Sequence, residues 1–228
     1  MTDRLNLSGQ VELVASALLP AIREAIKQNE IGNASPYQLG YARLGVSGAS
    51  FGVFQGDTNV SHVARATLAE ALTANGAGDD AVTRILGLVG RPCPNGNPLT
   101  ARDTALANGA LSSPAGMRLV DQMDNQLLAV VLSEVDTCIA GAATCSLALD
   151  PAALLYIALW VNMTGPPGTL VRWLSGDPEL GLSPPAGPVV TRQNLESYLH
   201  SSKFFMIHPK NFVHMQQSVD SAIPLLPV

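Results

Sequence analysis

Glu30 is the residue whose type and position best suit acid catalysis. It lies four residues after Ile26 and eight after Ile22, so it continues an apolar helical stripe and stands at the C-terminal end of that predicted helix. Apolar surroundings and the negative end of the helix dipole both favour a protonated carboxyl group. A carboxyl that keeps its proton near neutral pH can act as the general acid of a glycosidase. The alternative is a solvated glutamate at a frayed helix end.

Asp57 is the candidate for a second catalytic carboxylate. Inverting glycosidases need a base and retaining ones a nucleophile, and no Asp or Glu lies between Glu30 and Gln55. Asp57 follows directly after that interval. The equally weighted alternative is structural: an acid near the N-terminus of a helix predicted from about residue 60, where it would be stabilising. In that case the site has a single acid.

Several polar and aromatic side chains near these acids are suited to binding sugar. Ser47, Ser50, Tyr41 and Gln55 can form hydrogen bonds with sugar hydroxyls, and the alternative for Tyr41 is a core aromatic. Trp160 and Trp173 either stack on sugar faces or pack in the core, and their Leu, Ile and Val neighbours favour the core.

Other chemistries find little support in the sequence. The four histidines (His62, His200, His208 and His214) lack metal-ligand spacing, so we expect no metal site. No G-x-S-x-G elbow and no phosphate-binding glycine loop is present, and the predicted chemistry needs no cofactor. The three cysteines do not form a disulfide scaffold; they are either all thiols or include one Cys138–Cys145 pair.

The elements that position these residues begin with a helix and a hairpin. The helix is predicted from about Val11 to Asn29, with Pro20 causing a kink or a break near Leu19 and Gly32 as a stop signal. Alternating patterns in 36–45 (PYQLGYARLG) and 51–55 (FGVFQ) predict a short β-hairpin, joined by small residues at 46–50.

The rest of the chain is predicted to be helical, which makes the fold class mainly α (α+β). We expect helices at about 60–73, 79–90, 101–108, 114–140, 151–163, 169–175, 191–201 and 209–221. Capping residues precede several of them, namely Thr100, Ser113, Asp150 and Thr191. Loops rich in Pro and Gly lie at 90–98 and 176–188.

Composition excludes several classes of protein. The 228 residues are 47% hydrophobic and 14% charged, which suits one large folded domain. A net charge of -5 argues against a nucleic-acid partner and an anionic membrane surface. The longest apolar stretch, Pro151 to Val161, is too short to span a bilayer, so we expect no membrane insertion. The start of the chain does not resemble a secretory signal, so we expect synthesis in the cytoplasm and delivery by a separate route.

Three segments resemble the lysozyme-like superfamily, which includes goose-type lysozymes and lytic transglycosylases. In that family a helix ends in the catalytic Glu, and a small-residue segment leads into a G-hydrophobic-x-Q strand that lines the sugar groove. Residues 50–55 (SFGVFQ) are similar to that strand, and 30–33 (EIGN) are similar to the start of the family's Glu-Ser-x-Gly segment. Residues 160–168 (WVNMTGPPG) resemble the A-Y-N-x-G-P-G segment, with Asn162 at the position of the groove-facing Asn and Val161 replacing the family's Tyr.

The resemblance implies a single lysozyme-like domain over residues 1–228, with a small hairpin-containing lobe around 30–60 and an enlarged helical lobe over 60–228. It also implies an enzyme that cleaves β-1,4 bonds of peptidoglycan strands in the periplasm or on the cell wall, as a muramidase or a lytic transglycosylase. Glu30 would protonate the glycosidic oxygen, while Ser50, Gln55 and Asn162 would position sugar. The alternatives are a non-catalytic glycan- or protein-binding module and a chitosanase-like hydrolase of another amino-sugar polymer.

Overall fold

The protein is mainly helical with a small antiparallel sheet, which confirms the predicted fold class. The computed structural model describes residues 4–43, 45–183, 185 and 187–227, with side chains from residue 17 onward. Its helices are α1 Arg4–Glu30, α2 His62–Ala74, α3 Asp79–Val89, α4 Ala101–Ser112, α5 Pro114–Thr144, α6 Pro151–Thr164, α7 Gly168–Leu174, α8 Arg192–His200, α9 Lys203–Ile207 and α10 Pro209–Ala222. Short 3-10 turns cover Pro178–Leu180 and Ile223–Leu225.

The strands are short and form two sheets in the described part of the chain. β1 (Gly40–Tyr41), β2 (Ala49–Phe51) and β3 (Gly56–Asp57) form an antiparallel sheet in that order. β4 (Ala148–Leu149) and β5 (Val189–Val190) form a parallel pair. β1 and β2 pair as a hairpin, but β2 begins within residues 46–50, which were predicted to be the joining turn, and the pairs β2–β3 and β4–β5 were not predicted.

The chain divides into two compact units, one comprising residues 30–128 and the other residues 1–29 together with 129–228. This division differs from the predicted lobe boundary near residue 60. The reason is packing: α2 contacts β3, α3 and α4, so the sheet and these helices share one core. The prediction of a single domain stays a prediction.

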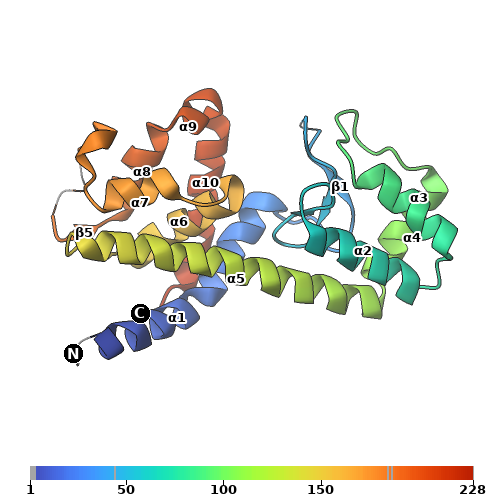
Figure 1. The fold of residues 1–228 in the computed structure, drawn as a ribbon, viewed down its shortest axis with the longest axis horizontal. Coiled ribbons are helices and arrows are strands. Elements are labelled where there is room, and N and C mark those ends of the chain that lie inside the picture. Colours follow the sequence, from blue (N-terminus) through green and yellow to red (C-terminus); the bar gives the residue numbers. More distant parts are fainter. Residues whose placement is uncertain (1–3, 44, 184, 186, 228) are drawn as a thin grey trace. The chain divides into compact units, whose positions relative to one another are not determined.

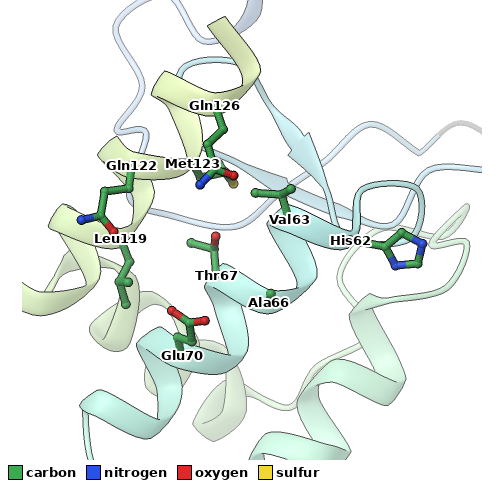
Figure 2. A pocket seen from close by; sticks show the side chains of 9 residues that line it. All are labelled: His62, Val63, Ala66, Thr67, Glu70, Leu119, Gln122, Met123 and Gln126. Atoms are coloured by element: carbon green, nitrogen blue, oxygen red, sulfur yellow. The ribbon is translucent and has the colours of Figure 1, made fainter. Parts of the chain in front are cut away.

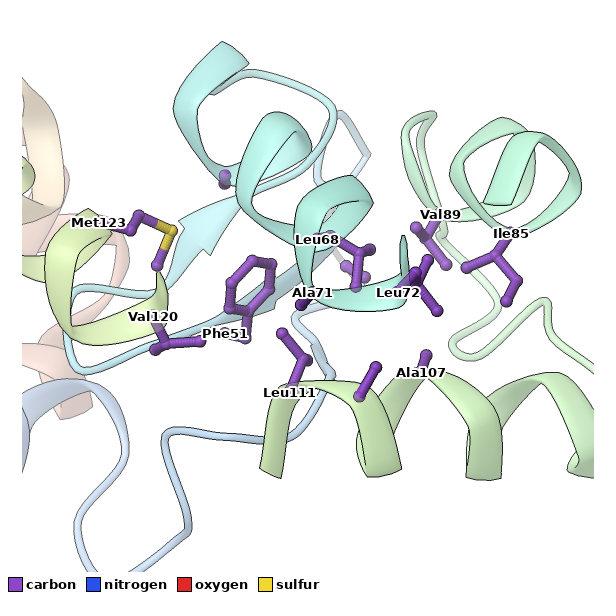
Figure 3. Packing of buried hydrophobic residues seen from close by; sticks show 13 residues of the cluster. Phe51, Leu68, Ala71, Leu72, Ile85, Val89, Ala107, Leu111, Val120 and Met123 are labelled. Carbon is purple, nitrogen blue, oxygen red and sulfur yellow. The ribbon is translucent and has the colours of Figure 1, made fainter. Parts of the chain in front are cut away.

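The unit of residues 30–128 is built around one hydrophobic core. Phe51 from β2 is fully buried among residues of α2, α4 and α5, including Leu68, Leu111 and Met123. Figure 3 shows these side chains converging beneath α2, and Figure 1 shows α2, α3 and α4 gathered beside β1. The sheet is therefore anchored to the helices through its central strand.

A tight corner joins α4 to α5. The Ser113 hydroxyl accepts a hydrogen bond from the Gly116 N–H at 3.0 Å and donates one to the Ala110 carbonyl at 2.8 Å. A Cβ atom added to Gly116 would lie 1.9 Å from that same carbonyl oxygen. Only glycine fits where the two helices approach this closely.

The other unit surrounds the apolar helix α6, whose residues 153–159 are all buried. The fully buried Tyr156 donates its hydroxyl proton to Glu196, and Arg192 bridges Glu196 and Asp220 at 2.8 and 2.6 Å. Burial alone would raise the pKa of Glu196, but hydrogen bonds from Tyr156 and Arg192 outweigh it and hold that pKa below its usual value. The side chain of Asp150 caps α6 as predicted.

Of the kink or break predicted at Pro20, the break is wrong, since α1 runs continuously through that residue. Proline removes one backbone hydrogen bond, but Leu18, Ala21 and Ile22 on both sides of it are buried. Packing of this apolar face supports the helix where local propensity does not.

Helix α5 is also long and apolar enough to cross a bilayer, by length and composition alone. One such helix is weak support for a membrane span, because the core helix of a globular protein passes the same test. Here α5 contributes the buried Val120 and Met123 to the core of residues 30–128.

All three cysteines are free thiols, so Cys138 and Cys145 do not pair in this structure. Cys138 is buried and Cys145 is exposed.

Candidate functional site

The small sheet brings together four of the six predicted site residues. Tyr41 is in β1, Ser50 in β2 and Asp57 in β3, with Gly40 opposite Ser50 and Ser50 opposite Asp57. Gln55 directly precedes β3. The sequence pattern therefore located a real cluster, although the geometry around each residue differs from the predicted hairpin.

Residues 52–55 form a tight turn, whereas the sequence pattern predicted a strand at 51–55. Gly52 has φ +82° and Gln55 has φ +50°, both in the left-handed region that an extended strand does not use. The Gln55 side-chain amide donates to the Gly52 carbonyl at 2.9 Å. A Cβ atom on Gly40 would lie 3.5 Å from Gln55 Oε1, an ordinary van der Waals distance, so the carboxamide lies directly beside β1. Gln55 is thus half-buried and held in one orientation.

A buried carboxylate that the sequence analysis missed holds this turn in place. Asp124, 1% exposed, comes from α5 and accepts hydrogen bonds from Val53 N–H at 2.9 Å and Phe54 N–H at 3.3 Å. The signal was present in the sequence, because Asp124 lies four residues after Val120 on the inward stripe of α5. A carboxylate on such a stripe indicates a specific polar partner.

Glu30 is half-buried and is the last residue of α1, as predicted. Gly32, with φ +53°, follows the helix end and fits the predicted stop signal. The next segment turns with Ala34 N–H bonded to the Ile31 carbonyl at 2.8 Å. The Pro36 carbonyl then accepts the Gly52 N–H at 2.7 Å, which ties the chain leaving Glu30 to the 52–55 turn.

Asp57 is engaged by the backbone of a neighbouring loop. Its Oδ1 accepts from Gly48 N–H at 3.0 Å and Asn59 N–H at 2.7 Å, and its Oδ2 accepts from Gly48 N–H at 3.2 Å. The N-cap of α2 is the side chain of Ser61, so Asp57 is not the capping residue, and its stabilising role near that helix N-terminus stays a prediction. These bonds favour a different structural role, the anchoring of the loop between β1 and β2. A catalytic role for Asp57 stays a prediction.

Ser50 and Tyr41 are less accessible than sugar-binding residues usually are. Ser50 is 7% exposed in the central strand. Tyr41 packs against the core, and burial, together with the nearby Cys93, raises its pKa to about 12. Its hydroxyl is buried without a hydrogen-bond partner among the described residues. These positions favour the core alternative for Tyr41, and sugar contacts by either residue stay predictions.

Asn162 lies in the last turn of α6 and belongs to the other compact unit. Its segment forms the predicted helix–turn–helix, since α6 ends at Thr164, Gly165 has φ +80° and α7 begins at Gly168. Its predicted role in holding sugar beside Glu30 stays a prediction.

Trp173 follows the core alternative, whereas Trp160 is half-buried. Trp173 is 6% exposed and stacks on Tyr198 with ring centroids 4.4 Å apart. Trp160 packs against Phe204 and Phe205 at centroid distances of 6.0 and 5.5 Å.

Within the part of the chain that the structure describes, no group of three or more His, Cys, Asp or Glu side chains is placed to hold a metal ion. Comparison of the chain with protein-family models, with curated proteins and with solved structures gives no match.

Proposed function

We propose that this protein cleaves β-1,4 glycosidic bonds of peptidoglycan strands, with Glu30 as the general acid. The observation that carries the proposal is the connection between two elements: α1 ends at Glu30, and the segment after it is hydrogen-bonded through Pro36 to the turn that orients Gln55. A helix-terminal acid joined to a small antiparallel sheet with a fixed glutamine is the arrangement that the resemblance to lysozyme-like enzymes implies.

In this proposal Glu30 donates its proton to the glycosidic oxygen as the bond to the anomeric carbon breaks. This step requires that Glu30, which is half-buried at the end of α1, carries its proton when the substrate binds. The oxocarbenium-like transition state then needs an electron pair from a second group. Gln55 supplies a neutral carboxamide that can hydrogen-bond a sugar but cannot act as that nucleophile.

The hydrogen bonds of Asp57 favour a reaction with one protein carboxylate. Both of its oxygens already accept backbone N–H groups, so its use as a base or nucleophile would loosen the loop at Gly48. The remaining nucleophile is the substrate's own N-acetyl oxygen, which bonds to the anomeric carbon as the glycosidic bond breaks. The C6 hydroxyl of the same sugar then displaces that oxygen and gives its proton to the Glu30 carboxylate, which restores the acid and leaves an anhydro-sugar end. This favours lytic transglycosylase chemistry over a two-carboxylate muramidase.

The test is Glu30→Gln assayed on purified peptidoglycan, with products identified by mass spectrometry. Loss of a general acid should lower turnover by about 10²–10⁴-fold. Glu24→Gln is the matched control on the same helix, where the carboxylate accepts a hydrogen bond from Gln28 at 2.6 Å, and it should retain activity. Unchanged lysis by Glu30→Gln would contradict the proposal.

The products separate the remaining alternatives. Anhydro-sugar ends identify a transglycosylase, and reducing ends identify a hydrolase. Binding without release of fragments identifies a non-catalytic module, and release from chitosan but not from peptidoglycan identifies a chitosanase-like enzyme. Asp57→Asn adds a further check, because a folded variant as inactive as Glu30→Gln would show that two carboxylates are needed.

A further inference from the structure

A pocket of about 310 Å³ lies between α2 and the first half of α5, within the unit of residues 30–128. Figure 2 shows Thr67 and Glu70 on α2 facing Leu119, Gln122 and Met123 on α5. Its volume is at the lower end of the range for ligand sites, which suits one or two residues of a polymer.

The polar side chains of this pocket are not used by the protein itself. His62, Thr67, Glu70, Gln122 and Gln126 line it, and none of them forms a hydrogen bond or ion pair with another described residue. Each keeps its donors and acceptors for water or a ligand. Five such groups around one small cavity form a recognition surface that the fold itself does not require.

The charged side chains that line the pocket favour a cationic ligand. Glu70 supplies a carboxylate, and no Lys or Arg is among the described residues that line the pocket. Arg65, also on α2, is directed to the Gly90 carbonyl at 3.2 Å. A carboxylate with no Lys or Arg beside it in the described lining repels phosphate and carboxylate ligands and attracts an ammonium group, whose three N–H donors it can accept.

The spacing of the two glutamines matches an extended peptide. Gln122 and Gln126 are one helical turn apart on the same face, a rise of about 6 Å. Alternate residues of an extended chain repeat at about 6.6 Å, and each presents a backbone N–H and C=O. Side-chain carboxamides pair with such groups as both donor and acceptor. Val63, Leu119 and Met123 provide an apolar floor for aliphatic carbon, and no aromatic ring that could stack on a sugar is among the described lining residues.

We propose that this pocket binds a short extended peptide that carries a primary ammonium group. The ammonium pairs with Glu70, the peptide backbone bonds to Gln122 and Gln126, and the aliphatic part of the ammonium-bearing side chain lies on the apolar floor. The inference does not rest on glycan cleavage, because peptide binding is measured separately from the role of Glu30.

The experiment is an NMR titration of the full chain with two capped tripeptides, acetyl-Ala-Lys-Ala-amide and its counterpart with norleucine in place of lysine. Both should shift the amide resonances of 62–70 and 119–126. The lysine peptide should bind about twofold to fivefold more tightly, as expected for a solvent-accessible ion pair.

Variants that remove one carboxylate test the assignment of Glu70 as the partner of the ammonium group. Glu70→Gln should abolish the preference for lysine, whereas Glu134→Gln, the same change on α5 outside the pocket, should leave it intact. A lysine preference that survives in Glu70→Gln would overturn the ion pair. Shifts of these resonances with a glucosamine oligomer, and none with either peptide, would overturn the peptide as the ligand.

Discussion

The hydrogen bonds from Val53 and Phe54 to Asp124 make the 52–55 turn dependent on one carboxylate. Replacing Asp124 with alanine removes the acceptor of two backbone N–H groups, at 2.9 and 3.3 Å. A hydrogen bond to a charged group contributes about 1.5–3 kcal/mol, so the loss of both bonds should lower the unfolding free energy by about 3–6 kcal/mol. Asp124→Asn keeps one acceptor oxygen and should lower it by about 1–3 kcal/mol.

The assay combines urea denaturation with amide hydrogen exchange at Val53 and Phe54. Hydrogen exchange at these amides reports on the turn itself. A denaturation curve alone does not, because two compact units can unfold in separate transitions. Asp121→Asn is the control: its exposed carboxylate accepts a hydrogen bond from Tyr37 at 3.0 Å, so the change should stay within about 1 kcal/mol. Wild-type stability in Asp124→Ala, with protection at both amides, would refute the reasoning.

Three further predictions follow from local geometry. Gly52→Ala and Gly76→Ala both place alanine at a φ near +80°, which costs about 1–2 kcal/mol each. Only the new methyl group at position 52 also collides with Asp124 and Met123. Urea denaturation should therefore show Gly52→Ala to be less stable than Gly76→Ala by about 1–3 kcal/mol. The depressed pKa of Glu196 contributes stability that is present above about pH 4.3 and lost as pH falls, so Glu196→Gln should reduce the acid dependence of thermal unfolding followed by circular dichroism. Exposed Cys145 should react with a maleimide in the folded protein, whereas Cys138, whose pKa burial raises to about 12, should react only on unfolding; equal labelling by mass spectrometry would contradict this burial.

The helices were predictable because their signals are local. Asp150, Thr100 and Thr191 cap α6, α4 and α8 with hydrogen bonds to backbone N–H groups, as their positions before apolar periodic segments indicated. The five-residue helix α9 was missed, since one turn and a half is too short for a periodic pattern.

The turn at 52–55 could not be predicted in the same way. Its alternating apolar residues fit a strand, but its conformation depends on Asp124, about seventy residues further along the chain. The same limit applies to Asp57, whose hydrogen bonds to the Gly48 N–H depend on how a preceding loop folds back. Local patterns identified the residues of the candidate site, and long-range contacts determine what each of them is free to do.

The close approach of α4 and α5 at Gly116 fixes the tilt of α5, and therefore the position of Asp124 further along that helix. Gly116 lies eight residues before Asp124 on a single helix, a rise of about 12 Å. A side chain at position 116 would push against the Ala110 carbonyl, and a tilt of α5 by about 5° would displace Asp124 by about 1 Å over that length. Such a shift would stretch a 2.9 Å hydrogen bond beyond its useful range. We therefore expect a side chain at position 116 to disturb, through Asp124, the 52–55 turn that contains Gln55, and a search for inactivating substitutions should include this position.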